Sequence, residues 1–432
     1  MAGGEDLLDH QRRGVDRLGA AVGPADVELD LGHAGHCGAG RRAWRSGRVG
    51  RSPSVVLRSH SSAGCPAHEH CDPRHSAAST PDRRGVRSRR GRRPPPTGVD
   101  TGPVLVGAVT GLVAGVLLGA VLHRGQLCFH ALAAGVGEGR RALLRAWLLG
   151  VALGSVGLAT LYATPLGDGL STGLPFRPVA AVVGGLLIGV GMAVARSCVS
   201  GLFHKLGEGM LGALVGLAGW AVGELLARQV AVPGPTVLPG GDGGTIPGVL
   251  GLPRWAVAVV FLAVVVAGTV AHRRRRGPDT PVHAWQWTGP RLGVALGVVL
   301  VAGWALAGLG GASFGPSTVG AVSGLVSGSP NPWLLAFLPG LVLGSAVFAR
   351  RDRALRVRGE LPVRYAQLAL GGLLLGAGGL VAGGCNLGHG LSGVAQLNVS
   401  SWVVVAAIAA GVLLTRRLVT ARDGRDEATV RA

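Results

Sequence analysis

The sequence has almost no lysine and few aromatic residues. Lys205 is the only lysine among the 42 basic residues, and aromatic side chains make up 4% of the chain. The net charge of +20 therefore comes from arginine, which lies either before residue 95 or at the edges of apolar runs. That distribution is typical of the positive-inside bias of membrane proteins and argues against a binding face for nucleic acid.

Several motifs are missing as well. The chain has six cysteines but no zinc-type C-x-x-C spacing and no dense disulfide pattern. It has no Walker-type phosphate loop, which argues against an ATP-driven pump, and no apolar segment after Met1 that could serve as a signal peptide. We therefore expect no enzymatic activity, no cofactor and no resident metal ion.

Apolar residues make up 48% of the chain, and glycine occurs 76 times. Small residues of this kind let membrane helices approach closely. Apolar runs of roughly 20 residues, the length that crosses a bilayer, recur along the chain. The sequence thus predicts an all-α integral membrane protein with about nine spans, at residues 103–122, 143–163, 178–196, 210–227, 254–271, 291–309, 332–349, 362–382 and 400–415.

Three regions follow from this pattern. Residues 1–98 form an Arg-, Pro- and Ser-rich tail that we expect to be disordered; an alternative is that this stretch is not translated and the start codon is misplaced. Residues 99–420 form the transmembrane domain, with halves at about 103–271 and 291–415. Residues 421–432 form a short cytoplasmic tail.

Arginine clusters give one consistent topology. If all of them face the cytoplasm, the spans alternate regularly and the first span begins outside. The arginine-rich tail would then also lie outside, against the positive-inside rule. Either this is a second reason to doubt that the tail is translated, or the first span is wrongly assigned. The clusters are Arg140, Arg141 and Arg145; Arg273–Arg276; Arg350, Arg351, Arg353, Arg356 and Arg358; and Arg416 and Arg417.

An internal duplication is the strongest structural signal. Residues 182–201 align without gaps to residues 369–388, and half of the aligned positions are identical, including Cys198 with Cys385. Under this topology the two copies cross the membrane in opposite directions, so we expect an inverted repeat with the substrate path at its pseudo-twofold interface. Chance similarity between Gly/Leu-rich helices is the weaker alternative.

Three segments interrupt the apolar runs with cysteine, glycine and polar residues: His123–Leu132, Ala195–Gly209 and Gly383–Gly393. Irregular backbone at membrane depth survives only where protein buries it or where it lines a wet cavity. The exposed amides of a following helix can hold an anion. We therefore expect re-entrant loops that meet at a central constriction.

Each membrane cysteine, taken alone, is as well explained as a small buried hydrophobe. Three of them at three helix breaks favour a functional role, because a thiol is a weak donor that suits a soft ligand such as a sulfur-bearing anion or a soft metal ion. The loop that corresponds to the Cys128 segment lacks cysteine. It offers Ser313, Ser317 and Thr318 instead.

The charged residues near the breaks have plainer explanations. Glu138 and Glu208, each in a Gly-Glu-Gly triplet before an apolar run, are expected to cap the following helix rather than to couple an ion. Glu224 and Arg228 are expected to pair along one helix. Arg196 and Lys205 fit snorkelling at the membrane edge, and Arg124 fits that role or substrate binding equally. Packing is favoured over metal ligation for His204 and His389.

Three segments resemble the loop motifs of the YeeE/YedE family of bacterial inner-membrane sulfur-compound transporters. They are RGQLCF (Arg124–Phe129), ARSCVSG (Ala195–Gly201) and GGCNLGHGLSG (Gly383–Gly393). The resemblance covers about residues 100–420. It implies an hourglass-shaped inverted repeat whose loops enter from both sides. It also implies thiosulfate uptake, with three path cysteines that fall here on Cys128, Cys198 and Cys385, and a small soluble sulfur-carrier partner.

We therefore predict a multi-pass protein of the bacterial inner membrane that passes thiosulfate, or a related anion, from thiol to thiol without net redox chemistry. The residues expected along the path are Cys128, Cys198, Cys385, Arg124, Gly125, Ser200, Gly201, Asn386, Gly388, His389, Gly390 and Ser392. One alternative is a membrane sulfur relay in which a low-pKa cysteine takes up sulfane sulfur and hands it to a soluble carrier. Others are a selenium-compound transporter and a soft-metal transporter.

Overall fold

A computed structural model describes residues 101–134, 137–230, 232–277, 279 and 281–431, all of which belong to the compact unit Arg90–Ala432. The predicted tail at residues 1–98 lies outside the described residues. So do the side chain of Glu138, whose capping role stays a prediction, and the side chains of residues 420–432.

The described part of the chain is helical and contains no strand beyond isolated bridges. The long helices are α2 (Thr101–Gly125), α4 (Gly137–Leu161), α5 (Pro178–Ala195), α7 (Gly212–Ala227), α9 (Arg254–Arg276), α10 (Gly289–Leu309), α12 (Pro332–Arg351), α13 (Pro362–Ala382) and α14 (Val399–Arg431). The short helices are α3 (Phe129–Ala134), α6 (Val199–Gly207), α8 (Ile246–Leu250), α11 (Ala321–Val326), η1 (Pro165–Gly167), η2 (Gly241–Gly244) and η3 (Gly388–Gly393).

Eight helical segments in the described residues are long and apolar enough to cross a membrane, which confirms an all-α membrane protein. The difference from nine lies at α7, the expected span 210–227. This helix has 16 residues and is about 24 Å long, shorter than the roughly 30 Å hydrocarbon core. The expected span 178–196 continues across its break into α6.

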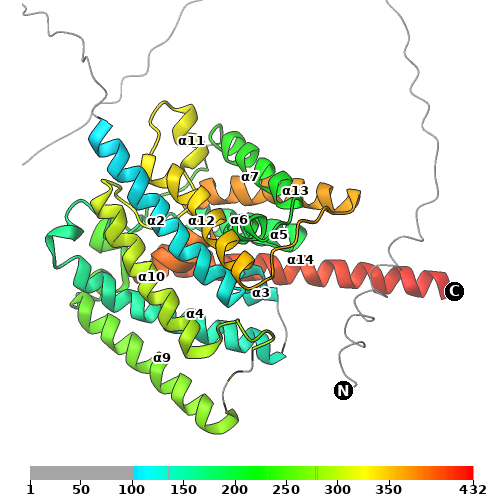
Figure 1. Cartoon of the computed structure of the whole chain (residues 1–432), viewed down its shortest axis with the longest axis horizontal. Coiled ribbons are helices and arrows are strands. Elements are labelled where there is room, and N and C mark those ends of the chain that lie inside the picture. The colour runs from blue at the N-terminus through cyan, green and yellow to red at the C-terminus, as the bar shows by residue number, and fades with distance from the viewer. Residues whose placement is uncertain (1–100, 135–136, 231, 278, 280, 432) are drawn as a thin grey trace, which may run out of the picture. The chain divides into compact units, whose positions relative to one another are not determined.

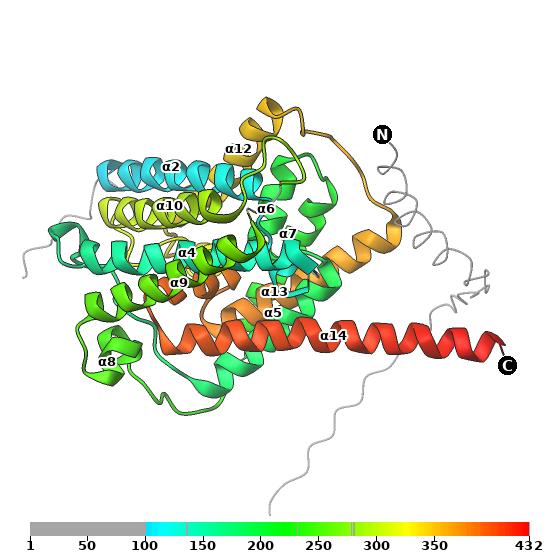
Figure 2. The same cartoon turned by 90° about the horizontal axis from the view of Figure 1, so that it is seen from below.

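The helices pack in two sets of corresponding pairs. Helix α2 packs on α12, and the corresponding pair is α10 on α4. Likewise, α7 packs on α13, and the corresponding pair is α14 on α5. The pairs α2–α10 and α5–α13 also lie in contact. Figures 1 and 2 show α2 beside α10 and α12, and α14 running past the bundle toward the C-terminus.

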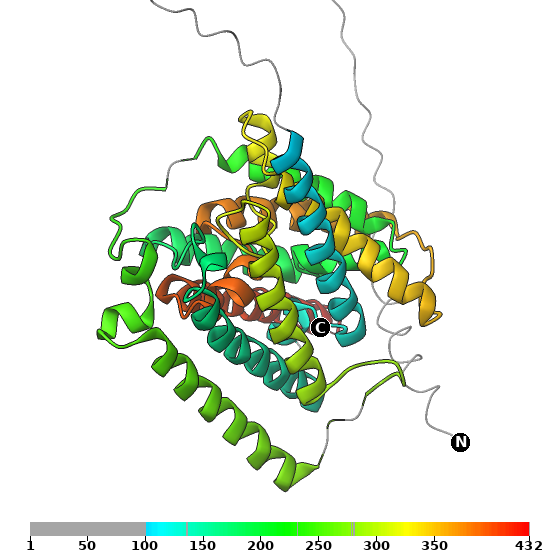
Figure 3. The same cartoon turned by 60° about the vertical axis from the view of Figure 1, so that its left-hand side comes forward.

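Glycine makes the closest helix contacts possible. A Cβ atom added at Gly115 in α2 would lie 2.2 Å from the Phe337 carbonyl oxygen of α12, and one added at Gly376 in α13 would lie 2.0 Å from the Trp220 carbonyl oxygen of α7. Small residues at such crossings are the usual packing device of membrane helices. Helix α9 stays at the periphery against α4 (Figure 3), and Ala258 is its one buried residue.

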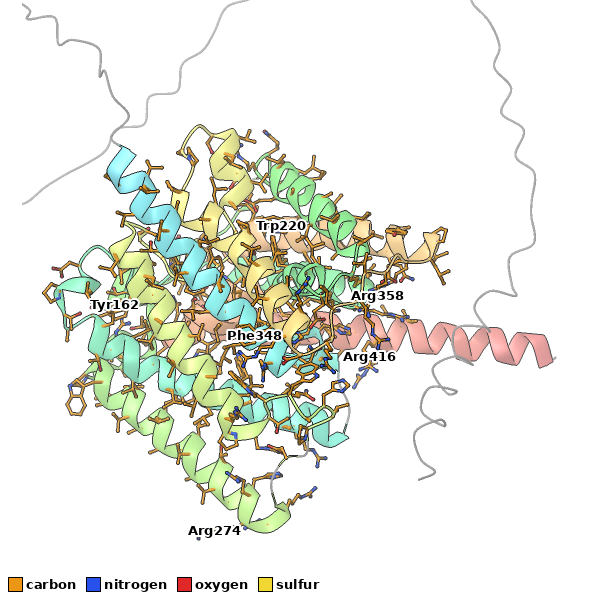
Figure 4. All side chains as sticks on the ribbon, in the orientation of Figure 1. Tyr162, Trp220, Arg274, Phe348, Arg358 and Arg416 are labelled. Atoms are coloured by element: carbon orange, nitrogen blue, oxygen red, sulfur yellow. The ribbon has the colours of Figure 1, made fainter. Side chains whose placement is uncertain are left out.

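The arginine clusters gather at one end of the bundle, which we call the arginine end. There Arg124 at the end of α2 bonds Asp352 just after α12, and Arg145 of α4 pairs with Asp279 after α9. Figure 4 shows Arg358 and Arg416 on one side of the view and Tyr162 on the other. The other end holds the connection between α4 and α5.

Glu224 of α7 does not pair with Arg228, so that prediction was wrong. Its side chain is fully buried, and Oε1 accepts hydrogen bonds from the backbone N–H of Gly320 (3.0 Å), the backbone N–H of Ser323 (3.0 Å) and the Ser323 hydroxyl (2.8 Å). A spacing of four residues allows a local pair, but burial of Glu224 against α11 removes it from the side chain of Arg228. The carboxylate instead anchors α11.

Replacing Glu224 by Ala is expected to destabilise the folded protein by about 1–3 kcal/mol, because buried donors would lose their acceptor. The thermal unfolding midpoint of the detergent-solubilised protein measures this. Asp168→Ala, at an exposed carboxylate between α4 and α5, is the matched control. Equal midpoints for the two variants would show that Glu224 does not hold α11.

Candidate functional site

The three membrane cysteines share one local backbone structure. Each lies two residues after a residue in the left-handed conformation that ends a long helix: Gln126 (φ 47°), Arg196 (φ 48°) and Gly383 (φ 77°). Only glycine adopts this conformation without strain. The two non-glycine positions therefore show that the surrounding structure holds these breaks in place.

Hydrogen bonds complete the same pattern at each break. The residue before the cysteine donates its N–H to a carbonyl five residues earlier, as in a Schellman helix end: Leu127 to Leu122, Ser197 to Met192 and Gly384 to Gly379. The cysteine carbonyl then accepts the first bond of the next helix: Cys128 from Leu132, Cys198 from Leu202 and Cys385 from His389. Each cysteine therefore occupies the N-terminal end of a short helical segment, beside amides without a partner inside that helix.

Two of the thiols meet directly. The Cys128 Sγ and Cys198 Sγ atoms lie 3.6 Å apart, and both side chains are buried. Cys198 Sγ also accepts the backbone N–H of Gly201 at 3.3 Å and lies 3.5 Å from Ser200 Oγ. A Cβ atom at Gly201 would lie 3.1 Å from each sulfur, so glycine is needed for this approach.

Cys385 lies at the equivalent break of the other half. Its Sγ accepts the backbone N–H groups of Leu387 (3.3 Å) and Gly388 (3.5 Å). The neighbouring Asn386 donates from Nδ2 to Ser200 Oγ at 3.3 Å, which links the Cys385 loop to the Cys128–Cys198 pair. Asn386 Oδ1 is buried and has no hydrogen-bond partner among the described residues, so the amide retains bonding capacity for a ligand.

A cavity of about 380 Å³ opens beside the Cys385 loop, between the α10–α11 connection and α12. Its lining includes Ser313, Ser317, Gly320 and Gly383. Ser317 lies against Gly388, since a Cβ atom there would be 3.0 Å from Ser317 Oγ. The predicted counterpart loop without cysteine therefore forms a polar wall of this cavity.

The remaining predicted residues of the third segment brace this loop. His389 Nδ1 lies 2.9 Å from Ser401 Oγ, and its Nε2 lies 3.1 Å from the Ala382 carbonyl oxygen. The Gly390 carbonyl accepts from Trp147 Nε1 at 2.6 Å, and Ser392 Oγ donates to the Pro316 carbonyl at 2.7 Å. These contacts hold η3 (Gly388–Gly393), a π-helical turn of a kind common at functional sites.

Arg124 and Gly125 are not placed with the thiols. The Arg124 guanidinium is engaged by Asp352, with Nε 2.9 Å from Oδ2, and by the Trp285 carbonyl at 3.3 Å. A Cβ atom at Gly125 would lie 2.4 Å from Leu292 Cδ1, so this glycine permits the packing of α2 on α10. Both belong to the arginine end rather than to the contacts around the three cysteines.

Glu208 was expected to cap the start of the following helix, and this prediction was wrong. Glu208 is the C-cap of α6, and its carboxylate accepts from Gln126 Nε2 at 2.8 Å and lies 2.6 Å from His123 Nδ1. Burial raises the pKa of Glu208, but the hydrogen bonds from His123 and Gln126 and the charge of His204 outweigh it and leave the pKa lowered. Neither His123 nor Gln126 was singled out, although both lie in the first broken segment.

Among the described residues, no group of three or more His, Cys, Asp or Glu side chains is arranged to hold a metal ion. The polar groups around the cysteines are thiols, hydroxyls, amides and backbone N–H groups. Such groups bind a soft anion through weak, shared hydrogen bonds.

The chain matches the family model described as "Sulphur transport" over residues 124–414, a range that contains all three cysteines. It is 30% identical over 324 residues to the protein named thiosulfate transporter TsuA of Spirochaeta thermophila, covering 68% of this chain and 93% of that protein. It is 25% identical over 342 residues to the protein of the same name from Escherichia coli, covering 73% of this chain and 96% of that protein.

Proposed function

The chain belongs to the sulphur transport (YeeE/YedE) family, and we propose that it imports thiosulfate across the bacterial inner membrane. One observation carries the proposal. Contacts link Asn386, next to Cys385, through Ser200 to the thiols of Cys198 and Cys128, and the outer cavity reaches the same loop at Gly383. The names of the relatives supply the substrate.

The orientation follows from the arginine end, which the positive-inside rule assigns to the cytoplasm. The cavity beside Cys385 then faces outside, and the Cys128–Cys198 pair lies nearer the cytoplasm. The corresponding helix pairs, and the left-handed residues Arg196 and Gly383 at aligned positions, support an inverted repeat. Its two halves contribute Cys198 and Cys385 as equivalent groups.

The proposed mechanism needs no covalent chemistry. Thiosulfate enters the outer cavity, where the hydroxyls of Ser313 and Ser317 can donate to its oxygens. The backbone amides at the Cys385 and Cys198 breaks replace part of its water shell, as helix N-termini do for anions. Protonated thiols donate weakly, which lets the ion leave each site again, as multi-site conduction requires.

A sulfur relay is the second candidate, and the 3.6 Å approach of two thiols is the observation that favours it. In a relay the sulfane sulfur would form a bond to a cysteine sulfur, the S–S bond of thiosulfate would break, and sulfite would leave. The resulting persulfide would pass its sulfur to a soluble carrier. A transporter instead moves the whole ion.

Thiosulfate labelled separately in its sulfane or its sulfone sulfur distinguishes the two. We expect proteoliposomes to accumulate both labels at equal rates, because the ion crosses intact. A relay would bind the sulfane label to protein and leave the sulfone label outside as sulfite. Empty liposomes provide the background, and accumulation of neither label would contradict the proposed function itself.

A further inference from the structure

Glu208 joins the two helix breaks that carry the thiol pair. Its Oε1 atom lies 2.6 Å from His123 Nδ1 and 2.8 Å from Gln126 Nε2. His123 is fully buried near the end of α2, and Gln126 is the left-handed residue two positions before Cys128. One carboxylate oxygen therefore fixes both sides of the bend that leads to Cys128.

The same carboxylate belongs to the helix that begins at Cys198. Helix α6 has Cys198 as its N-cap and Glu208 as its C-cap, with nine residues between them. A helix of that length is a stiff rod of about 14 Å. Anchoring its far end to His123 and Gln126 thus sets where Cys198 lies relative to Cys128.

The anchor is itself held from a third helix. Asp352, just after α12, lies 3.3 Å from His123 Nε2 and 2.9 Å from Arg124 Nε. The ring of Trp285 stacks on His123 with centroids 4.7 Å apart, and the Arg356 backbone N–H donates to the Glu208 carbonyl at 3.0 Å. Charge-assisted bonds are about twice as strong as neutral ones, so these contacts hold the Glu208 carboxylate and the His123 ring in place.

Gln126 gives an independent reason to assign Glu208 a positioning role. Its φ of 47° is a strained conformation for a non-glycine residue, which persists only where surrounding contacts enforce it. The Gln126 side chain spans the bend, with Nε2 bonded to both the His123 carbonyl (3.0 Å) and the Glu208 carboxylate (2.8 Å). The bond from Gln126 to the Glu208 carboxylate therefore helps to hold the strained bend, and the bend in turn fixes the position of the carboxylate.

We propose that Glu208 is a positioning residue for transport, which holds the Cys128 and Cys198 thiols together through α6 on one side and through His123 and Gln126 on the other. This inference rests on the proposed function, since the thiol pair is assigned there to the substrate path. Glu208 itself does not touch the ion. It acts by keeping two weak donors at a spacing where one ion can contact both.

The test measures the thiol pair directly. Membranes are treated with copper-phenanthroline, and the rate at which Cys128 and Cys198 form a disulfide is followed by mass spectrometry of the linked peptides. Glu208→Ala removes both contacts, Glu208→Gln keeps the size and loses the charge, and Glu208→Asp keeps the charge on a shorter side chain. Asp168→Asn, at an exposed carboxylate, is the matched control.

We expect about tenfold slower cross-linking in Glu208→Ala, an intermediate rate in Glu208→Asp, and wild-type behaviour in Asp168→Asn. Thiosulfate uptake should fall in the same order through a higher KM. Wild-type cross-linking in Glu208→Ala would overturn the proposal, as would a loss of uptake with the thiol pair unchanged. If Glu208→Ala does not accumulate in the membrane, Glu208→Gln decides by the same criterion. Absence of uptake by the wild-type protein would contradict the proposed function but would leave the cross-linking result interpretable.

Discussion

Cys198→Ala is expected to lower thiosulfate uptake by roughly ten- to a hundredfold. Cys198 is the central group of the proposed path, because its sulfur contacts Cys128 Sγ, Ser200 Oγ and the Gly201 N–H. A hydrogen bond to a charged group contributes about 1.5–3 kcal/mol, and each 1.4 kcal/mol corresponds to a factor of ten. Alanine cannot replace the lost donor, so the ion would meet an apolar step between two polar sites.

Initial rates of labelled thiosulfate uptake, in cells that lack their own importers, measure this effect. Cys71→Ala is the matched control because Cys71 lies outside the region that matches the family. Cys198→Ser should retain more activity than Cys198→Ala, since a hydroxyl also donates. Undiminished uptake by Cys198→Ala would remove this residue from the path.

Gly201→Ala should have an effect of similar size without removing any polar group. The new methyl carbon would lie 3.1 Å from the sulfurs of Cys128 and Cys198 and 2.8 Å from Ser197 Oγ. Overpacking of this kind costs about 1–3 kcal/mol, which corresponds to roughly five- to a hundredfold if it appears in transport. The thiol pair has to separate, and the break before α6 has to shift with it.

Gly268→Ala is the control for this variant. Gly268 also lies in a helix, α9, but a Cβ atom there meets nothing within 4 Å. Both variants should be present in the membrane at wild-type levels, and only Gly201→Ala should lose uptake and cross-linking between Cys128 and Cys198. Equal uptake by the two variants would show that close approach of the sulfurs to the α6 backbone is irrelevant to transport.

The sequence was sufficient to predict the membrane spans and the segments that carry the thiols. Apolar length and arginine position are local properties, so eight of the nine expected spans meet the criteria for crossing a bilayer. The short α7 was the exception, because its apolar run includes residues that fold into the turn before Gly212. Cysteine next to glycine at a break, as in Gly383–Gly393, was also readable from the sequence.

Hydrogen bonds between residues far apart in the chain could not be predicted from the sequence. Glu208 bonds His123 85 positions earlier, and Glu224 bonds Ser323 99 positions later. In both cases the sequence suggested a role within the nearest helix, since spacing along one helix is the only geometry that a single sequence specifies. The left-handed conformations of Gln126 and Arg196 could not be predicted either. Glycine, as at Gly383, commonly adopts this conformation, whereas glutamine and arginine do not indicate it.

In the proposed mechanism the ion passes between the thiol-bearing helix breaks. A crystal structure of the protein soaked with thiosulfate, with anomalous signal from its two sulfur atoms, tests it most directly. We predict anomalous density between Cys385 and the Cys128–Cys198 pair, within hydrogen-bond distance of Asn386 or Ser200. Thiosulfate bound only at the arginine end, in crystals where the region between these cysteines is closed by packed side chains, would contradict it.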